Sequence, residues 1–179
     1  MKVIETNRLI IRHMNKDDAE FILGLLNQPT WLRFIGDRGV KTLEDAQNYI
    51  LQGQVETYAR LGFGFYIVEL KESGSAIGMC GLAKRDYLDD VDIGFALLPQ
   101  YCGNGYAYES ASAVFDYAKN VLGLKRLVAT TRVGNQSSAK LLEKLGLRFE
   151  RMMPHPDGSR ELLVFAVEME ESAKERSVR

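Results

Sequence analysis

The chain has no long apolar run and contains little cysteine, proline, tryptophan or histidine. Of its 179 residues, 2 are Cys, 4 are Pro, 1 is Trp and 2 are His. No apolar stretch approaches the roughly 20 residues that a membrane-spanning helix needs, so we expect no membrane association. The first residues also lack the apolar core of a signal peptide. These absences favour a cytoplasmic protein.

The two cysteines predict no metal site. Cys80 and Cys102 match no known metal-ligand spacing. We interpret them as reduced thiols, because a disulfide between them would need an oxidising compartment. The two histidines, His13 and His155, are interpreted as a strand residue and a turn residue rather than as catalysts.

The chain also lacks an excess of either positive or negative charge. The net charge is −1, and Lys and Arg are scattered without the basic stripe that marks a nucleic-acid partner. Hydrophobic residues make up 46% and charged residues 26%, which is ordinary for a globular domain with its own core. We therefore predict a single domain over residues 1–170 and a charged, frayed tail over residues 171–179.

A strand, a glycine loop and a helix follow one another in the middle of the chain. Residues 91–97 are apolar and β-rich, and beyond Ala107 apolar residues recur at the three- and four-residue steps of a helix. Such a junction directs free backbone N–H groups toward one point, at the positive end of the helix dipole. Gly103 and Gly105 remove side chains that would keep a ligand from those amides. The pattern predicts a phosphate or pyrophosphate site.

Other interpretations of this loop fit less well. Asn104-Gly105 is a common hairpin dipeptide, but a second strand does not follow it. A Walker loop would need Gly-Lys-Ser/Thr, and a dinucleotide fingerprint would need Gly or Ala where Tyr108 stands.

A second motif lies further along the chain. Asn135 is predicted to cap a helix with an inner face of leucines, and Gly146 is predicted to end it. Taken alone, this is only a short, well-delimited helix.

Together the two motifs resemble the GNAT acyltransferases. The loop Cys102-Gly103-Asn104-Gly105-Tyr106-Ala107 is similar to the family's Arg/Gln-x-x-Gly-x-Gly/Ala signature, with Cys102 in the basic position, a departure typical of the RimJ/RimL-type branch. The segment 135–147 is similar to the family's Asn-x-x-Ala/Ser-x-x-Leu segment, with Ser138 at the small position. The resemblance covers about residues 6–168. It implies an α/β fold with a mixed, mostly antiparallel central sheet of about seven strands and about four flanking helices.

The resemblance also implies acetyl-CoA as cosubstrate, with no metal. The pyrophosphate would lie on the loop, and the pantetheine arm would pair with the strand backbone at Phe95, Ala96 and Leu97 and with Asn135. An N–H of Leu97 or Leu98 would polarise the thioester carbonyl. The acceptor would be a primary amine, a protein N-terminus or a small amine, and the chain a monomer or homodimer. The alternative is a non-catalytic coenzyme A sensor.

Two residues are candidates for proton transfer. Asp92 is the acidic residue closest in sequence to Phe95, Ala96 and Leu97, the strand segment expected to bind the acetyl donor. Gly94 and Ala96 lie on the same face of that strand as Asp92, and because they are small they are expected to leave room for the amine. A solvated surface charge is the other interpretation of Asp92, with Glu69 and Glu109 as the next candidates for the base. Leu142 stands where many members have a tyrosine that protonates the leaving thiolate. Ser138 could replace it, or could simply bond to the helix backbone.

The flanking segments follow the same rules of periodicity. We expect one strand over residues 3–13 and a helix capped by Asn15 and ended at Gln28-Pro29. A further helix is expected to begin at Thr42, which with Asp45 resembles a capping box with Asp in place of Glu. Residues 30–41 are expected to be irregular, either a loop over the acceptor site or a surface loop pinned by Trp31 and Phe34. Strands are expected over residues 63–70, 76–84, 91–97, 126–131, 148–153 and 162–168.

Overall fold

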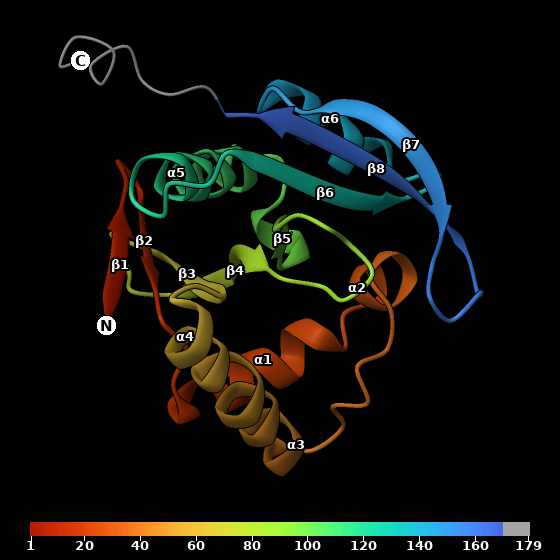
Figure 1. Ribbon diagram of the computed structural model, residues 1–179. Helices are drawn as coiled ribbons and strands as arrows, with labels where there is room; N and C mark the ends of the chain where they lie inside the picture. Colours follow the sequence, from red (N-terminus) through yellow and green to blue (C-terminus); the bar gives the residue numbers. More distant parts are fainter. Residues whose placement is uncertain (170–179) are drawn as a thin grey trace, which may run out of the picture.

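The computed structural model describes residues 1–169 and has one eight-stranded sheet at its centre (Figure 1). The strand order is β1-β2-β3-β4-β5-β6-β8-β7. All neighbours are antiparallel except β5 and β6, which are parallel. The expected mixed, mostly antiparallel sheet is confirmed. The strands are β1 (Lys2–Glu5), β2 (Leu9–Arg12), β3 (Phe65–Leu70), β4 (Ala76–Ala83), β5 (Asp92–Leu97), β6 (Arg126–Arg132), β7 (Arg148–Pro154) and β8 (Glu161–Glu168).

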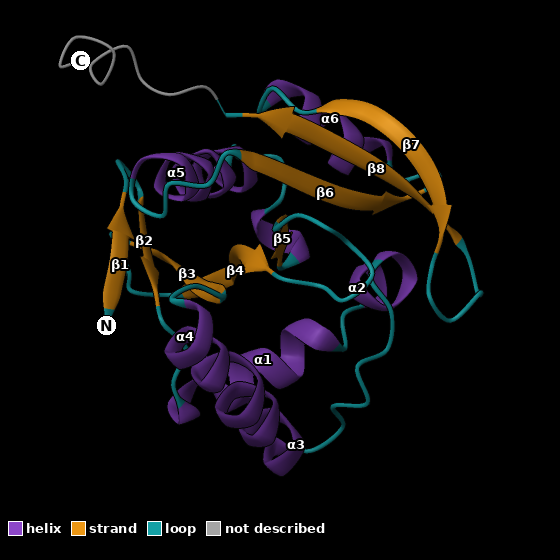
Figure 2. Ribbon diagram, viewed as in Figure 1, coloured by secondary structure: helices purple, strands orange, loops and turns teal. Residues whose placement is uncertain are grey.

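Helices cover both faces of the sheet (Figure 2). On one face, α5 (Tyr106–Asn120) packs Ala111 and Val114 against Leu82 and Ile93 of β4 and β5. On the same side of the core, α6 (Gln136–Lys144) buries Leu142. The other face carries α1 (Ala19–Leu26), α2 (Pro29–Phe34) and α3 (Leu43–Asn48). The short helix α4 (Glu56–Leu61) follows α3. Within residues 1–169, no helix has the length and apolarity to cross a membrane.

The segment predicted as one strand over residues 3–13 is two strands, which is why the sheet has eight strands rather than seven. The backbone N–H of Thr6 donates to Leu9 O at 2.9 Å and reverses the chain between β1 and β2. The β-branched residues are equally compatible with one long strand or a tight hairpin. The hydrogen bond across the turn decides between them.

The segment expected to be irregular at 30–41 begins with a helix. The helix before Pro29 does end there, since α1 stops at Leu26, but Pro29 is itself the first residue of a new helix, α2. Proline suits that position because the first helical N–H has no partner within the helix. Trp31 is buried, and its Nε1 donates to Gly36 O at 3.1 Å, which supports the pinned-loop interpretation for residues 35–40.

The third helical segment runs almost without interruption from Leu43 to Leu61. Its first turn carries the predicted capping box, in which Thr42 and Asp45 each accept from the other's backbone N–H. A π-helical stretch, Tyr49–Val55, joins α3 to α4, and Gly62 ends the helix in the left-handed region. Figure 1 shows these elements as one rod below the sheet.

The feature that positions the site is a gap in the middle of the sheet. β5 and β6 pair only at Asp92 and Val128, where Val128 N donates to Val91 O at 3.0 Å. Beyond that point the strands separate, and β6, β8 and β7 fan away from the other five (Figure 1). The edge of β5 from Ile93 to Leu97 is therefore free. The predicted tail at 171–179 lies outside the described residues.

Candidate active site

The glycine loop lies at the end of β5, as predicted. A 3₁₀ turn, Pro99–Tyr101, leads into Cys102–Gly105, and α5 begins at Tyr106. Gly103 and Gly105 have φ of +79° and +82°, a region in which a side chain would be strained. Gly105 is the N-cap of the 15-residue α5, so the unpaired N–H groups of the first helical turn are directed out of the loop. This geometry suits a bound anion.

Alternate residues of β5 direct their backbone N–H and C=O groups toward the gap between β5 and β6. Leu98 donates its backbone N–H to Ile77 O on β4 at 2.8 Å. Alternation along the antiparallel pair then directs the backbone groups of Ala96 to β4 as well, and those of Phe95 and Leu97 toward the gap. The expectation that Leu98 could polarise a thioester therefore fails, because its N–H is used. Ala96 likewise has no backbone group free for an arm in the gap.

The helix α6 stands on the other side of the gap. Asn135 caps it, with its Oδ1 accepting from Ser138 N at 3.3 Å. Ser138 is half-buried, and within residues 1–169 its hydroxyl makes no hydrogen bond. The interpretation of Ser138 as a residue bonded to its own helix backbone is therefore not supported. Leu142, at the position of the usual tyrosine, is buried in the core next to α5.

Asp92 is a buried ion-pair partner and not a solvated surface charge. It is 2% exposed, and its Oδ2 accepts from Arg85 Nε at 2.8 Å. Its Oδ1 is buried without a partner among the described residues. Burial raises the pKa of Asp92, while the charges of Arg85 and Arg38 oppose this rise. A carboxylate with a raised pKa and a free oxygen is well suited to accept a proton.

The space expected beside Asp92 is occupied. Alternation does put Asp92, Gly94 and Ala96 on one face, but a Cβ at Gly94 would lie 3.0 Å from the ring of Phe65. Gly94 makes room for this ring rather than for an acceptor. The open space that was expected across Gly94 is therefore not present in the structure.

The other two candidate bases are in ion pairs. Glu69 lies 2.7 Å from Arg12 Nη2, on the strand pair β2–β3. Glu109 lies 2.7 Å from Arg8 Nε. Burial would raise the pKa of Glu109, but hydrogen bonds from Thr6 and Arg8 outweigh burial and lower that pKa. Neither carboxylate lies on β5, so Asp92 remains the candidate.

The cysteines are both free, and they lie apart. Cys80 is buried within β4, where burial raises the pKa of its thiol to about 12. Cys102 is exposed in the glycine loop. A thiol with so high a pKa as that of Cys80 is not reactive near neutral pH.

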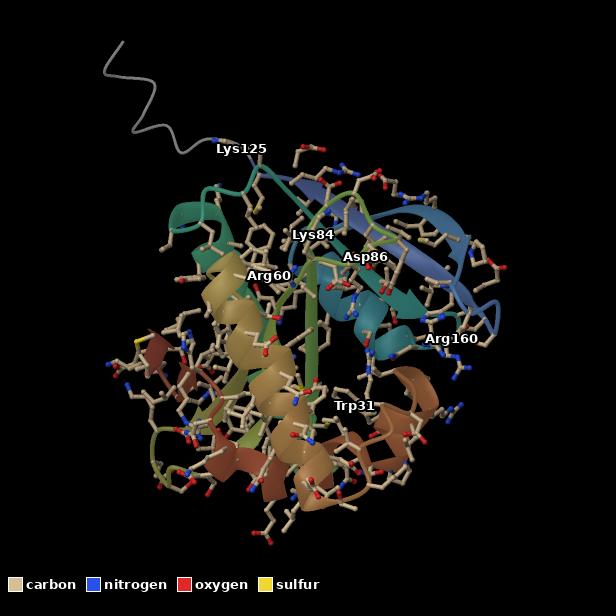
Figure 3. The ribbon with its side chains drawn as sticks, turned by 60° about the horizontal axis from the view of Figure 1, so that its bottom comes forward. Trp31, Arg60, Lys84, Asp86, Lys125 and Arg160 are labelled. Atoms are coloured by element: carbon tan, nitrogen blue, oxygen red, sulfur yellow. The ribbon has the colours of Figure 1, made fainter. Side chains whose placement is uncertain are left out.

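Two arginines from the C-terminal half hold the segment around α2. Arg132 Nη1 donates to Arg33 O, and Arg160 Nη2 donates to Ile35 O at 2.9 Å. Figure 3 labels Arg160, from the hairpin between β7 and β8, and Trp31, from α2. Sequence reasoning missed these arginines because their carbonyl partners lie 99 and 125 residues away along the chain.

Comparisons with known proteins match this chain to one family and to one fold. Residues 8–148 match the family described as "Acetyltransferase (GNAT) domain". The Bacillus subtilis (strain 168) protein YoaA, named as an uncharacterized N-acetyltransferase, is 30% identical over 84% of this chain and 85% of its own length. A GNAT-family acetyltransferase from Bacillus anthracis has a TM-score of 0.77 at 26% identity and covers 94% of this chain and 99% of its own. RimL, a ribosomal L7/L12 α-N-protein acetyltransferase solved with coenzyme A, shares the fold with a TM-score of 0.80 at 18% identity, over 94% and 98% of the two chains.

Proposed function

This chain belongs to the GNAT acetyltransferase family, whose members act on amines with acetyl-CoA, and we propose that it acetylates a primary amine by direct attack in a ternary complex. The acceptor would be a protein N-terminus or a small amine. One observation carries the proposal: the free edge of β5 runs from Asp92 straight into a glycine loop at the N-terminus of α5. The N–H groups of the loop suit a pyrophosphate, and the unpaired backbone groups of the β5 edge suit an arm that contains amides.

The donor would lie along this edge. Backbone N–H groups from Gly103 to Ala107 would hold the pyrophosphate, and the backbone groups of Phe95 and Leu97 would pair with the arm. The Leu97 N–H would polarise the thioester carbonyl, because it is directed into the gap and the Leu98 N–H is not. Bound acetyl-CoA supplies an activated acyl carbon to the amine.

Asp92 would take the proton of the amine. Its free Oδ1 and its raised pKa support a base role, and Arg85 holds the other carboxylate oxygen in place. The neutral amine would attack the carbonyl carbon, so that the C–N bond forms and the C–S bond breaks. The amine proton would pass to Asp92, through a water where the carboxylate is out of direct reach.

Ser138 would return a proton to the leaving sulfur. Its half-buried hydroxyl has no other hydrogen bond among the described residues, and it lies in the first turn of α6, on the far side of the gap. A water at the same point is the competing proton source. Buried Leu142 favours the second candidate function, a coenzyme A sensor without turnover, since the usual acid of the family is missing.

A thiol-release assay separates the two functions. Purified protein is given acetyl-CoA and a panel of amines, including peptides with free N-termini, polyamines, amino acids and amino sugars, while calorimetry measures coenzyme A binding. Coenzyme A release that depends on one amine, and that Asp92→Asn slows by about 10²- to 10⁴-fold, supports catalysis. Tight binding without release on any amine favours the sensor. No binding of coenzyme A would refute both.

A further inference from the structure

A surface groove of about 910 Å³ lies between β1 and α5, and Arg8 and Gly105 are among the residues that line it. Arg8 lies between β1 and β2, far from the loop in sequence. Its Nη1 donates to Asn104 O at 2.9 Å. Its guanidinium lies 4.4 Å from the centroid of the Tyr106 ring, within the range of a cation–π contact. Arg8 thus contacts the residues on both sides of Gly105.

Arg8 is itself held by α5. Its Nε donates to Glu109 Oε2 at 2.7 Å, and its backbone N–H donates to Glu109 Oε1 at 2.9 Å. Thr6 Oγ1 donates to the same Oε1 at 2.6 Å. Glu109 lies in the first turn of α5, where a negative charge is favoured by the helix dipole. The start of α5 and the β1–β2 turn are therefore joined into one unit.

The loop has little else to hold it. Residues 102–105 are exposed, and the side chain of Asn104 bonds only to Tyr101 O and Cys102 O within the same turn, among the contacts of the described residues. A Cβ at Gly105 would lie 3.2 Å from Arg8 Nη2, so the guanidinium packs directly against the N-cap. Among the described residues, Arg8 is the one hydrogen-bond partner of Asn104 that comes from a distant segment.

Contact with the Asn104 carbonyl has a geometric consequence. In a planar trans peptide unit the C=O and the N–H point in opposite directions, and the unit that contains Asn104 O also contains the N–H of Gly105. Because Arg8 holds Asn104 O, it also sets the direction of the Gly105 N–H, which then points away from Arg8. A charged donor on the carbonyl also polarises the peptide and makes that N–H a stronger donor.

We propose that Arg8 is a positioning residue for donor binding: it orients the peptide between Asn104 and Gly105 so that the Gly105 N–H is directed at the pyrophosphate of the donor. The inference rests on the proposed function, because it requires a pyrophosphate on this loop. Arg8 touches neither the donor nor the acceptor in this arrangement. Its effect is transmitted through one peptide unit.

Arg8→Gln tests the inference, with Lys71→Gln as the matched control. The Lys71 side chain is 37% exposed and the Arg8 side chain 42%, and Lys71 pairs with Glu5 and donates to Thr6 O without touching the loop. Both changes remove one positive charge from the same surface. Calorimetry with coenzyme A should show a Kd about 10-fold higher for Arg8→Gln, the factor that corresponds to about 1.4 kcal/mol. For Lys71→Gln the Kd should stay within about twofold of wild type.

Arg8→Lys distinguishes orientation from charge. A lysine keeps the positive charge but cannot donate to Glu109 and to Asn104 O at once in the geometry of the guanidinium. We expect the Kd of Arg8→Lys for coenzyme A to rise nearly as far as that of Arg8→Gln. This holds whatever the melting temperature of the variant, as long as the protein is folded at the temperature of the measurement. Wild-type affinity in Arg8→Gln, or full rescue by Arg8→Lys, would overturn the positioning role. Absence of coenzyme A binding in the wild-type protein would instead overturn the proposed function.

Discussion

Gly105→Ala tests the site most directly, because it adds only a Cβ at the N-cap of α5. Gly105 has φ of +82°, and an L-residue in the left-handed region costs about 1–2 kcal/mol. The new Cβ would lie 3.2 Å from Arg8 Nη2, the flexible end of a side chain that can move. The backbone strain therefore dominates the cost, and the loop relieves it by rotating away from positive φ.

Such a rotation redirects the N–H of Gly105. A hydrogen bond to a charged group contributes about 1.5–3 kcal/mol, so its loss should raise the Kd for coenzyme A by roughly 10- to 150-fold. The same change should lower the melting temperature by about 2–8 °C, at about 2–4 °C per kcal/mol for a chain of this size. Calorimetry and thermal unfolding measure the two effects separately.

Gly74→Ala is the control. Gly74 has φ of +69° in the turn between β3 and β4, and nothing lies within 4 Å of the position that a Cβ would take there. We expect a similar loss of melting temperature with wild-type affinity for coenzyme A. A Gly105→Ala protein that loses stability but keeps wild-type affinity would refute the assignment of the pyrophosphate to this loop.

The other predictions concern proton transfer and the fold. Asp92→Asn should lower turnover by about 10²- to 10⁴-fold and abolish the acidic limb of the pH–rate profile, because an amide cannot accept the proton. In wild type, activity should fall as the pH decreases through the pKa of Asp92, and burial places that limb above the ordinary value of 3.8. An unchanged limb in Asp92→Asn would exclude it as the base. Ser138→Ala should lower kcat by about 100-fold and change the KM for the donor less. The same change at the exposed neighbour, Ser137→Ala, should alter neither kcat nor KM. If the two variants have the same kcat, water and not Ser138 is the acid. Thr42→Ala removes the side-chain cap of α3 and should cost about 1 kcal/mol of stability, with coenzyme A affinity unchanged and with Thr42→Ser largely restoring stability in thermal unfolding. A Thr42→Ala protein as stable as wild type would contradict the capping argument.

Local features of this protein follow from its sequence. The capping box of Thr42 and Asp45 and the cap at Asn135 form where the residue types predict them, because a cap is a contact over three residues. The strand, loop and helix around Gly105 are likewise visible in the sequence, because the change of apolar period occurs within a few residues. The GNAT family could be predicted from these motifs alone.

Errors arose where one local pattern fits two structures. The β-branched residues of 3–13 suit one strand or a hairpin, and Pro29 can follow one helix or begin the next. Packing selects between such alternatives, and it does so through contacts that are remote in the sequence.

The chemistry of the site depends on those remote contacts. The sequence put Asp92 on the strand that leads into the glycine loop, but only the folded sheet buries it, pairs it with Arg85 and leaves Oδ1 without a partner among the described residues. Only the β4–β5 register shows that the Leu97 N–H is available and the Leu98 N–H is not. The contact of Arg8 with Asn104 joins segments 96 residues apart. Sequence patterns report interactions between near neighbours, whereas the pKa of a carboxylate and the direction of an N–H are set by whatever the tertiary fold packs against them.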